Sequence, residues 1–243
     1  MLYKKPLMLL KSNGGVSGVS RQKSGGAKAN VQVQVVPTAK TIPEANALAV
    51  SLGIAQSANF AGLDLNYANL LIQRLAEIRQ IFPQLEQLHF IGNSKSMGKT
   101  SAPATFWSAL GVPIGLTLHP KYFSSKGLKG YEEALKSMVS QKKSPVGCDT
   151  LKSVIDHEIG HYLDYGRVKG TSSTGLQLSR DSQILKIYQG MTKEEITENL
   201  SSYASKNIRE FIAESWSEYQ NNPHPRATAK AVGDRIVEIY QSK

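Results

Sequence analysis

The stretch DTLKSVIDHEIGHYLDYG, residues 149–166, decides how the rest of the chain is interpreted. Within it, His157 and His161 stand four positions apart, and Glu158 directly follows the first. On a helix, a four-residue step brings both imidazoles to one face, where they can share a zinc ion. Glu158 then points about a quarter turn away, so it can reach a metal-bound water without binding the metal. The spacing therefore indicates peptide-hydrolase chemistry.

The residues around this motif favour the helix that the geometry requires. Asp149 and Thr150 are candidate N-caps, and Gly166 is a candidate C-terminal stop. One broad apolar stripe consists of Leu151, Val154, Ile155, Ile159, Tyr162 and Leu163. At about 100° per residue, Glu158 falls within this stripe, where a zinc-bound water would offset the cost of burying its charge. The opposite side of the wheel carries Ser153, Asp156 and Gly160. The alternative is an ordinary amphipathic helix with two surface histidines.

Composition is that of a globular protein: 243 residues, 40% hydrophobic and 20% charged, are enough for one sizeable domain, with two small domains as the alternative. The single cysteine, Cys148, excludes an internal disulfide. The apolar run at residues 7–10 is too short for the core of a signal peptide, and no run of about 20 apolar residues could cross a membrane. We expect a soluble chain without a signal peptide and without membrane contact.

The net charge of +10 is placed unevenly, because seven lysines and arginines precede the first acidic residue, Glu44. Residues 1–40 are therefore interpreted as a basic, flexible arm, although residues 31–36 alternate like a short strand. Such an arm could make weak contact with DNA or with an acidic partner. A solvated tail is the alternative, since no aromatic residues interleave with the charges.

Periodicity and turn residues predict a mainly helical chain with a small sheet. Strands are expected over residues 85–91 and 115–119. Besides the motif helix, helices are expected over residues 41–53, 64–81, 131–139, 192–203, 207–219 and 227–240. The segment GNSKSMGKTS, residues 92–101, resembles a phosphate-binding loop but has five residues instead of four before its Gly-Lys-Thr, and Pro103 follows. It is interpreted as a plain loop.

Two histidines leave a catalytic zinc site incomplete, because such sites usually have three protein ligands and one open position. The compact metzincin spacing would need a histidine where the chain has Arg167. A downstream residue must therefore complete the site, and the candidates are Glu210, Glu214 and His224. Glu210, Glu214 and Glu218 also recur every four residues, which is equally typical of a solvated helix face. His224, between two prolines, is most simply a loop residue.

HEIGHYLD at residues 157–164, followed by SYASKNIREFIAE at residues 202–214, resembles the glutamate-zincin group that includes anthrax lethal factor and clostridial Pro-Pro endopeptidases. In that group a tyrosine lies seven residues before the glutamate ligand, as Tyr203 does before Glu210. The resemblance implies an α+β zincin-like metallopeptidase domain over residues 41–243, with a small twisted sheet above the motif helix.

The same resemblance implies one zinc per chain, bound by His157, His161 and Glu210. Zinc lowers the pKa of a bound water to about 7, and Glu158 would accept its proton as the general base. Tyr203 would donate a hydrogen bond to the developing oxyanion. The implied function is that of a zinc-dependent endopeptidase acting on a peptide or protein substrate.

From about residue 41 to its end, the chain also resembles the peptidase-like domain of phage minor head and head-morphogenesis proteins. This similarity implies a phage-encoded protein of the host cytoplasm or virion, with capsid or head proteins as partners in particle assembly or entry. The alternative is a non-catalytic virion component that keeps a structural zinc and uses its basic arm to contact DNA or capsid.

Two further acids are expected just outside the metal ligands. Asp164, one turn beyond His161, could orient His157 or His161 through the outer ring nitrogen, or it could be a solvated acid at the helix end. Glu214, one turn after Glu210, is expected to hold a ligand histidine or the helix pair. Cys148 is expected to be a buried small residue near the helix cap rather than a latent metal ligand, and His119 a polar residue at a strand edge. These two residues are given no catalytic role.

Overall fold

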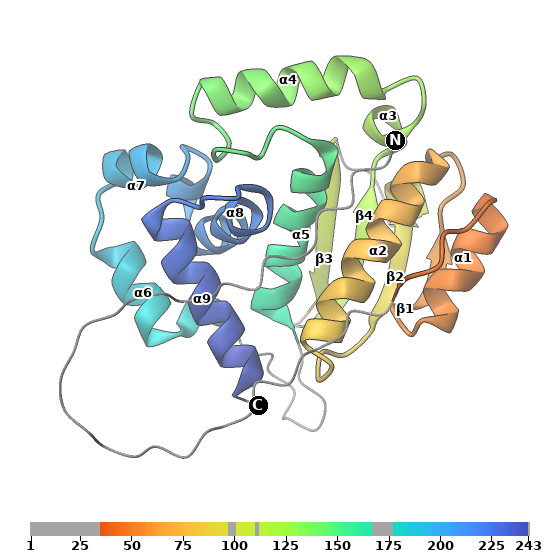
Figure 1. The fold of residues 1–243 in the computed structure, drawn as a ribbon, viewed down its shortest axis with the longest axis horizontal. Helices are drawn as coiled ribbons and strands as arrows, with labels where there is room; N and C mark the ends of the chain where they lie inside the picture. The colour runs from red at the N-terminus through yellow and green to blue at the C-terminus, as the bar shows by residue number, and fades with distance from the viewer. Residues whose placement is uncertain (1–34, 97–100, 110–111, 167–176, 243) are drawn as a thin grey trace. The chain divides into compact units, whose positions relative to one another are not determined.

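The computed structural model describes residues 35–96, 101–109, 112–166 and 177–242. They form an α+β fold that is mainly helical and has a small sheet, as the sequence predicts; the sheet is mixed and has four strands (Figure 1). Most of the expected basic arm, residues 1–34, lies outside the described residues, and so does most of its strand-like segment. In the described part of the chain, no helix is both long enough and apolar enough to cross a membrane.

The sheet has the strand order β1-β2-β4-β3. Its strands are β1 (Ala55–Asn59), β2 (Leu88–Asn93), β3 (Ala104–Ala109) and β4 (Val112–Leu118). The first three strands in this order are parallel, whereas β3 pairs antiparallel with β4 and occupies an edge. The sequence predicted only β2 and β4. It missed β1, AQSAN, because only the first residue of this strand is fully buried and the apolar pattern is weak.

The helices before the motif are α1 (Ile42–Ser51), α2 (Leu65–Ile81), α3 (Pro120–Phe123) and α4 (Leu128–Ser140). Three of them, α1, α2 and α4, agree with the expected ranges to within a few residues, whereas the short α3 was not predicted. The segment that resembles a phosphate-binding loop leads into a strand, because a 3₁₀ turn at Ser94–Ser96 follows β2 and β3 begins at Ala104. The described residues on either side of the loop therefore lack the helix that a phosphate site needs at this point.

The helices of the C-terminal half are α5 (Leu151–Tyr165), α6 (Ser182–Gln189), α7 (Lys193–Asn199), α8 (Ile208–Asn221) and α9 (Ala227–Gln241). Two 3₁₀ turns, η2 (Leu178–Arg180) and η3 (Ala204–Lys206), lie between them. The helix expected to reach residue 203 ends at Asn199, so Tyr203 is the residue before η3 instead of a helix end. Helix α6 was not predicted.

Side-chain caps fix where the two most important helices begin. Thr150, not Asp149, is the N-cap of α5, and its hydroxyl accepts a hydrogen bond from the backbone N–H of Ser153. Asn207 caps α8 by accepting hydrogen bonds from the backbone N–H groups of Arg209 and Glu210. This cap sets the position of Glu210 in the first turn of α8.

Helix α5 lies at the centre of the fold. It packs on β3 and β4, beside α2, and along α8 (Figure 1). It is therefore buried on more sides than the helical wheel suggested: Ser153, Asp156 and Gly160, on the side opposite the apolar stripe, are all buried. The wheel counted polar and small residues as outward-facing, but α2 and α8 cover that side as well.

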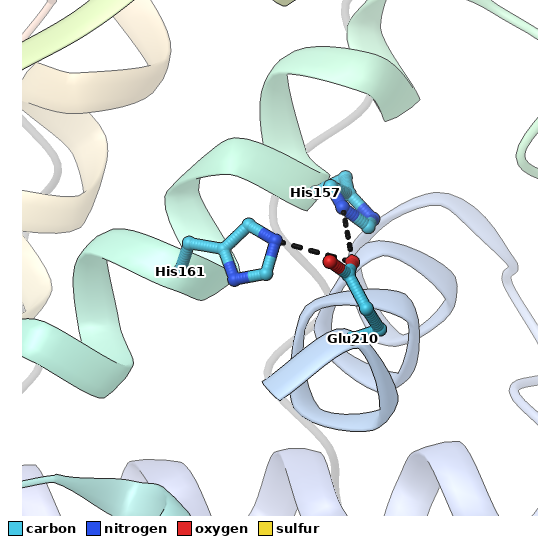
Figure 2. A group of neighbouring side chains, drawn as sticks. All are labelled: His157, His161 and Glu210. Atoms are coloured by element: carbon cyan, nitrogen blue, oxygen red, sulfur yellow. Dashed lines mark ion pairs between the residues drawn. The ribbon is translucent and has the colours of Figure 1, made fainter. Parts of the chain in front are cut away.

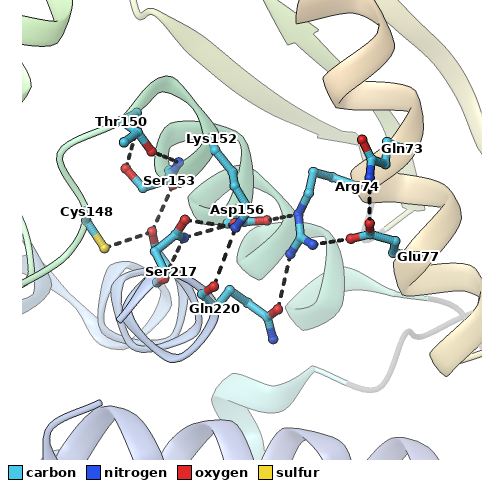
Figure 3. Close-up of polar contacts among 11 residues, drawn as sticks. Gln73, Arg74, Glu77, Cys148, Thr150, Lys152, Ser153, Asp156, Ser217 and Gln220 are labelled. Carbon is cyan, nitrogen blue, oxygen red and sulfur yellow. Dashed lines mark hydrogen bonds and ion pairs between the residues drawn. The ribbon is translucent and has the colours of Figure 1, made fainter. Parts of the chain in front are cut away.

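On this side of α5, the buried carboxylate of Asp156 is neutralised by basic side chains of the protein itself (Figure 3). Arg74 of α2 donates to its Oδ1 at 2.8 Å, and Lys152 lies 2.7 Å from its Oδ2. Asn221 of α8 also donates to Oδ2, at 2.9 Å. Burial alone would raise the pKa of Asp156, but Arg74 and Lys152 hold it below the ordinary value. We refer to these four residues as the paired cluster.

Candidate metal centre

The candidate centre lies where α5 and α8 pass each other closely. Gly160, inside the HEIGH motif, makes this approach feasible, because a Cβ added to it would lie only 2.6 Å from the Cα of Ala213 on α8. The second of the two positions between Glu158 and His161 must therefore hold glycine for α5 and α8 to pack this closely. Close passage brings the first turn of α8, with Glu210, against the face of α5 that carries the two histidines (Figure 2).

His157, His161 and Glu210 converge on one point (Figure 2). Glu210 Oε2 lies 3.2 Å from Nε2 of His157 and 3.3 Å from Nε2 of His161, and the three ligand atoms all lie within 4.8 Å of one another. In a tetrahedral zinc site, bonds of about 2.0–2.1 Å place neighbouring ligand atoms about 3.3 Å apart. The two nitrogen–oxygen distances are of this size, so the group could hold a metal ion.

The carboxylate of Glu210 gives a second indication of a cation site. Its Oε2 is buried, and no described residue donates a hydrogen bond to it with acceptable geometry despite the nearby imidazoles. Burial alone would raise the pKa of this carboxyl, but the two histidines hold it well below the usual range. A buried, ionised oxygen without a donor needs a positive charge that faces it, and a divalent metal would supply that charge when both imidazoles are neutral.

Glu214 pairs with Nδ1 of His157, the ring nitrogen that faces away from Glu210. Glu214 Oε1 lies 2.7 Å from Nδ1 of His157, and its Oε2 accepts a hydrogen bond from Ser201 at 2.8 Å. This acid–histidine pair leaves Nε2 directed at the convergence point. Burial by itself lowers the pKa of His157, but Glu210 and Glu214 raise it well above the ordinary value. No sequence pattern identified Ser201 as part of this site.

The interpretation of the α8 acids as a solvated face is wrong. Glu214 and Glu218 are buried, and Glu210 is largely shielded. Glu218 forms a bidentate pair with Arg226, which ties the end of α8 to the start of α9. Each acid of the stripe therefore has a partner of its own: the histidine pair for Glu210, His157 for Glu214, and an arginine for Glu218.

Glu158 lies on the sheet side of the histidines. Its Oε2 accepts a hydrogen bond of 2.6 Å from the backbone N–H of Phe106, on the outer edge of β3. The side chain is almost fully buried, as the helical wheel predicted. No sequence pattern could have identified Phe106, because the contact uses its backbone and depends on the unpredicted strand β3.

Tyr203 lies beside the histidines on the η3 side. Its ring centre is 5.8 Å from that of His157, at an angle of 66°. Burial raises the pKa of Tyr203 to about 12, and the Glu210, Glu158 and Glu214 carboxylates add to the shift. The phenol therefore keeps its proton at neutral pH and remains a hydrogen-bond donor.

Asp164 is buried at the end of α5, so it is not the solvated acid of the alternative interpretation. Its Oδ1 accepts a hydrogen bond of 2.7 Å from the backbone N–H of Ser179, and its Oδ2 is 4.0 Å from Nε of Arg209. The first contact anchors η2 to α5, and the second links α8 to α5. That Asp164 also orients a ligand histidine stays a prediction.

Three further candidate residues, Cys148, His119 and His224, are not part of this group and have structural roles. Cys148 is buried with its sulfur 3.2 Å from Ser217 Oγ, and burial raises the pKa of its thiol, so it is a packed thiol and not a thiolate. His119 caps α3 by accepting a hydrogen bond at Nδ1 from Lys121. His224 lies in the loop before α9. Among the described residues, only His157, His161 and Glu210 form a group that could hold a metal.

Comparisons with family models, with curated proteins and with solved structures found no match to this chain. Any functional assignment therefore depends on the geometry of these residues.

Proposed function

We propose that this protein is a zinc-dependent endopeptidase with a zincin-like fold. The observation that carries the proposal is the convergence of His157 Nε2, His161 Nε2 and Glu210 Oε2, with both nitrogens 3.2–3.3 Å from the oxygen and all three ligand atoms within 4.8 Å of one another. Structural zinc sites usually close with four protein ligands, whereas catalytic ones keep a position open. With three ligands among the described residues, the centre has the composition of a catalytic site.

The surrounding residues supply the remaining parts of a hydrolase. When bound, zinc would supply an acidic water and polarise the carbonyl of the scissile peptide bond. Glu158, adjacent in sequence to the ligand His157, accepts the proton of the attacking water and passes it to the leaving amine. The Phe106 N–H fixes one oxygen of Glu158, which leaves the other to take the proton.

Tyr203 supplies the oxyanion contact. Its phenol, protonated at neutral pH, donates a hydrogen bond to the carbonyl oxygen as negative charge develops there. Glu214 keeps His157 in the tautomer that presents Nε2. In this proposal each residue has a single role. His157, His161 and Glu210 bind the metal, and Glu158 transfers protons. Tyr203 stabilises the oxyanion, and Glu214 orients His157.

The proposal is tested by a peptide-library digest with the zinc-loaded full chain, the metal-free chain and the Glu158→Gln variant. We expect cleavage only by the zinc-loaded wild type, together with about one zinc per chain in both the wild type and Glu158→Gln. Near-normal turnover by Glu158→Gln would show that the general base is another group. Zinc binding without cleavage of any peptide would favour the alternative of a structural zinc in a non-catalytic protein.

A further inference from the structure

Two exposed cations lie on aromatic rings at the border of the candidate centre. On the His157 side, Lys206 Nζ is 3.5 Å from the ring centre of Tyr203, whose ring contacts that of His157. Only one aromatic ring therefore separates the ammonium from a metal ligand. Cation–π contacts of this kind hold a charge in place without neutralising it.

The second cation lies on the His161 side. Arg209 Cζ is 4.8 Å from the ring centre of Tyr165, one helical turn beyond His161 on α5. The Tyr165 ring in turn lies 5.6 Å from that of Phe106, the residue whose backbone holds Glu158. Arg209 is therefore connected through two rings to the proposed general base.

Neither of these two cations has a close ion pair among the described residues. Lys206 makes no ion pair with any other described residue. Arg209 only approaches Asp164, at 4.0 Å, and its side chain stays 56% exposed. The nearby carboxylates of Glu210 and Glu214 are turned to the histidines. The accessible charge at the border of the centre is therefore positive.

We propose that the centre takes acidic peptides, with Asp or Glu side chains on both sides of the cleaved bond; this rests on the proposed function. Lys206 and Arg209 flank the ligand group on its two histidine sides, and side chains on one face of an extended peptide recur about every 7 Å. Acidic side chains beside the scissile bond can therefore meet both cations.

A nucleic acid fits this border less well. Binding of single strands relies on aromatic faces that stack on bases. Here the faces of Tyr203 and Tyr165 carry Lys206 and Arg209. What remains accessible is charge, which suits the carboxylates of a peptide.

The experiment uses the zinc-loaded full chain and matched peptides that differ only in having acidic, neutral or basic residues around the bond found in the library digest. The variant Lys206→Glu/Arg209→Glu is compared with Lys136→Glu/Lys193→Glu, which changes the net charge equally on α4 and α7. Binding is measured by fluorescence anisotropy in the Glu158→Gln background, and cleavage by kcat/KM. Reversal of both border charges should lower the preference for acidic over basic peptides about tenfold.

The control pair should leave that preference unchanged, and the milder variant Lys206→Gln/Arg209→Gln should lie between control and reversal. Cleavage by the wild type without any preference for acidic peptides would overturn this inference and leave the proposed function standing. Failure to cleave any peptide would overturn both. Binding of single-stranded DNA, but not of acidic peptides, that the reversal abolishes would assign the border to nucleic acid and overturn the inference.

Discussion

The two clusters of charged residues along α5 each contain a shielded carboxylate, but the groups that surround the carboxylate differ. In the paired cluster, Asp156 meets Arg74, Lys152 and an amide, so every strong charge has a counter-ion in the chain (Figure 3). In the candidate centre, Glu210 and two imidazoles turn possible metal-binding atoms toward a common point (Figure 2). Both clusters lie between α5 and α8, one near the end of α8 and one near its beginning.

This difference shows how a buried acid can be interpreted. A carboxylate enclosed by Arg and Lys needs nothing from outside the chain, and its role is to hold helices together. A carboxylate that faces possible metal ligands is neutralised by them only while they are protonated, and a bound metal would displace those protons. The second arrangement indicates a binding site, and the following changes test whether the two clusters really differ in this way.

The largest effect is expected at the centre itself. Glu210→Gln should weaken zinc binding more than about 100-fold and abolish cleavage, because it removes a charged ligand. Glu214→Gln is the matched control one turn away, and the loss there should be about 10–100-fold, as for other groups that orient a ligand. Zinc titration of both folded variants provides the measurement. Normal binding by Glu210→Gln with none by Glu214→Gln would move the ligand by one helical turn and remove the role assigned to Tyr203.

The next effect concerns the paired cluster. Asp156→Asn leaves Arg74 buried and short of one counter-ion, so the free energy of unfolding should fall by about 3 kcal/mol. Replacing both partners, in Arg74→Leu/Asp156→Leu, should cost less than the single change, because the charges that then lose a partner, Lys152 and Glu77, are partly exposed, whereas Arg74 is buried. Urea unfolding measures both. Zinc affinity of the folded variants should not change, and its loss would show that the two clusters act as one.

The sequence predicted the motif helix, its cap region and the α8 cap because these depend on local hydrogen bonds. It did not predict that Asp156 and Gly160 are buried, because a helical wheel shows only the periodicity of one helix and not the number of elements packed around it. The paired cluster joins residues 82 positions apart, Arg74 and Asp156, and no spacing rule connects them.

For the candidate centre, spacing identified His157, His161 and Glu158 as candidates, whereas the choice of Glu210 over Glu214 needed a resemblance to a family. The structure places these two acids on different nitrogens of His157, a distinction that depends on the angle at which α8 crosses α5. Contacts through the backbone, such as that of Phe106 with Glu158, cannot be predicted from the pattern of side chains in the sequence.

Gly160→Ala tests the close helix approach on which both clusters depend. The added Cβ would meet the backbone of Ala213, so α5 and α8 must move apart, at a cost of about 1–3 kcal/mol in the free energy of unfolding. Zinc affinity should fall as well, because Glu210 moves with α8. Gly130→Ala on α4 is the control: nothing lies within 4 Å of the added Cβ, so stability should stay equal or rise by up to about 1 kcal/mol. Equal effects of the two changes would show that Gly160 is not needed for the helix contact.

The smallest effect is expected for a pair that is built like the paired cluster but lies near the surface. Asp181 caps α6, accepting hydrogen bonds from the N–H groups of Gln183 and Ile184, and its Oδ2 lies 2.7 Å from Nη2 of Arg235 on α9. Asp181→Asn keeps an oxygen for the cap and removes only the charge. We expect a loss of about 0.5–1 kcal/mol, as for other ion pairs near the surface, well below the effect of Asp156→Asn.

The stability difference between wild type and Asp181→Asn should also depend on pH, and the pKa of Asp181 sets the direction of that dependence. Burial alone would raise the pKa of Asp181, but Arg235 and the capped N–H groups hold it below the ordinary value. A carboxyl with a lowered pKa in the folded state contributes its full stability above the pKa of the unfolded chain, about 3.9, and loses it as the pH falls toward the folded value. The difference between wild type and Asp181→Asn should therefore be constant from about pH 6 to 8 and shrink below about pH 4, as measured by urea unfolding. If the difference grew on acidification, Asp181 would be stabilised in its protonated form. If the difference were as large as that for Asp156→Asn, ion pairing rather than burial would set the size of the stability loss.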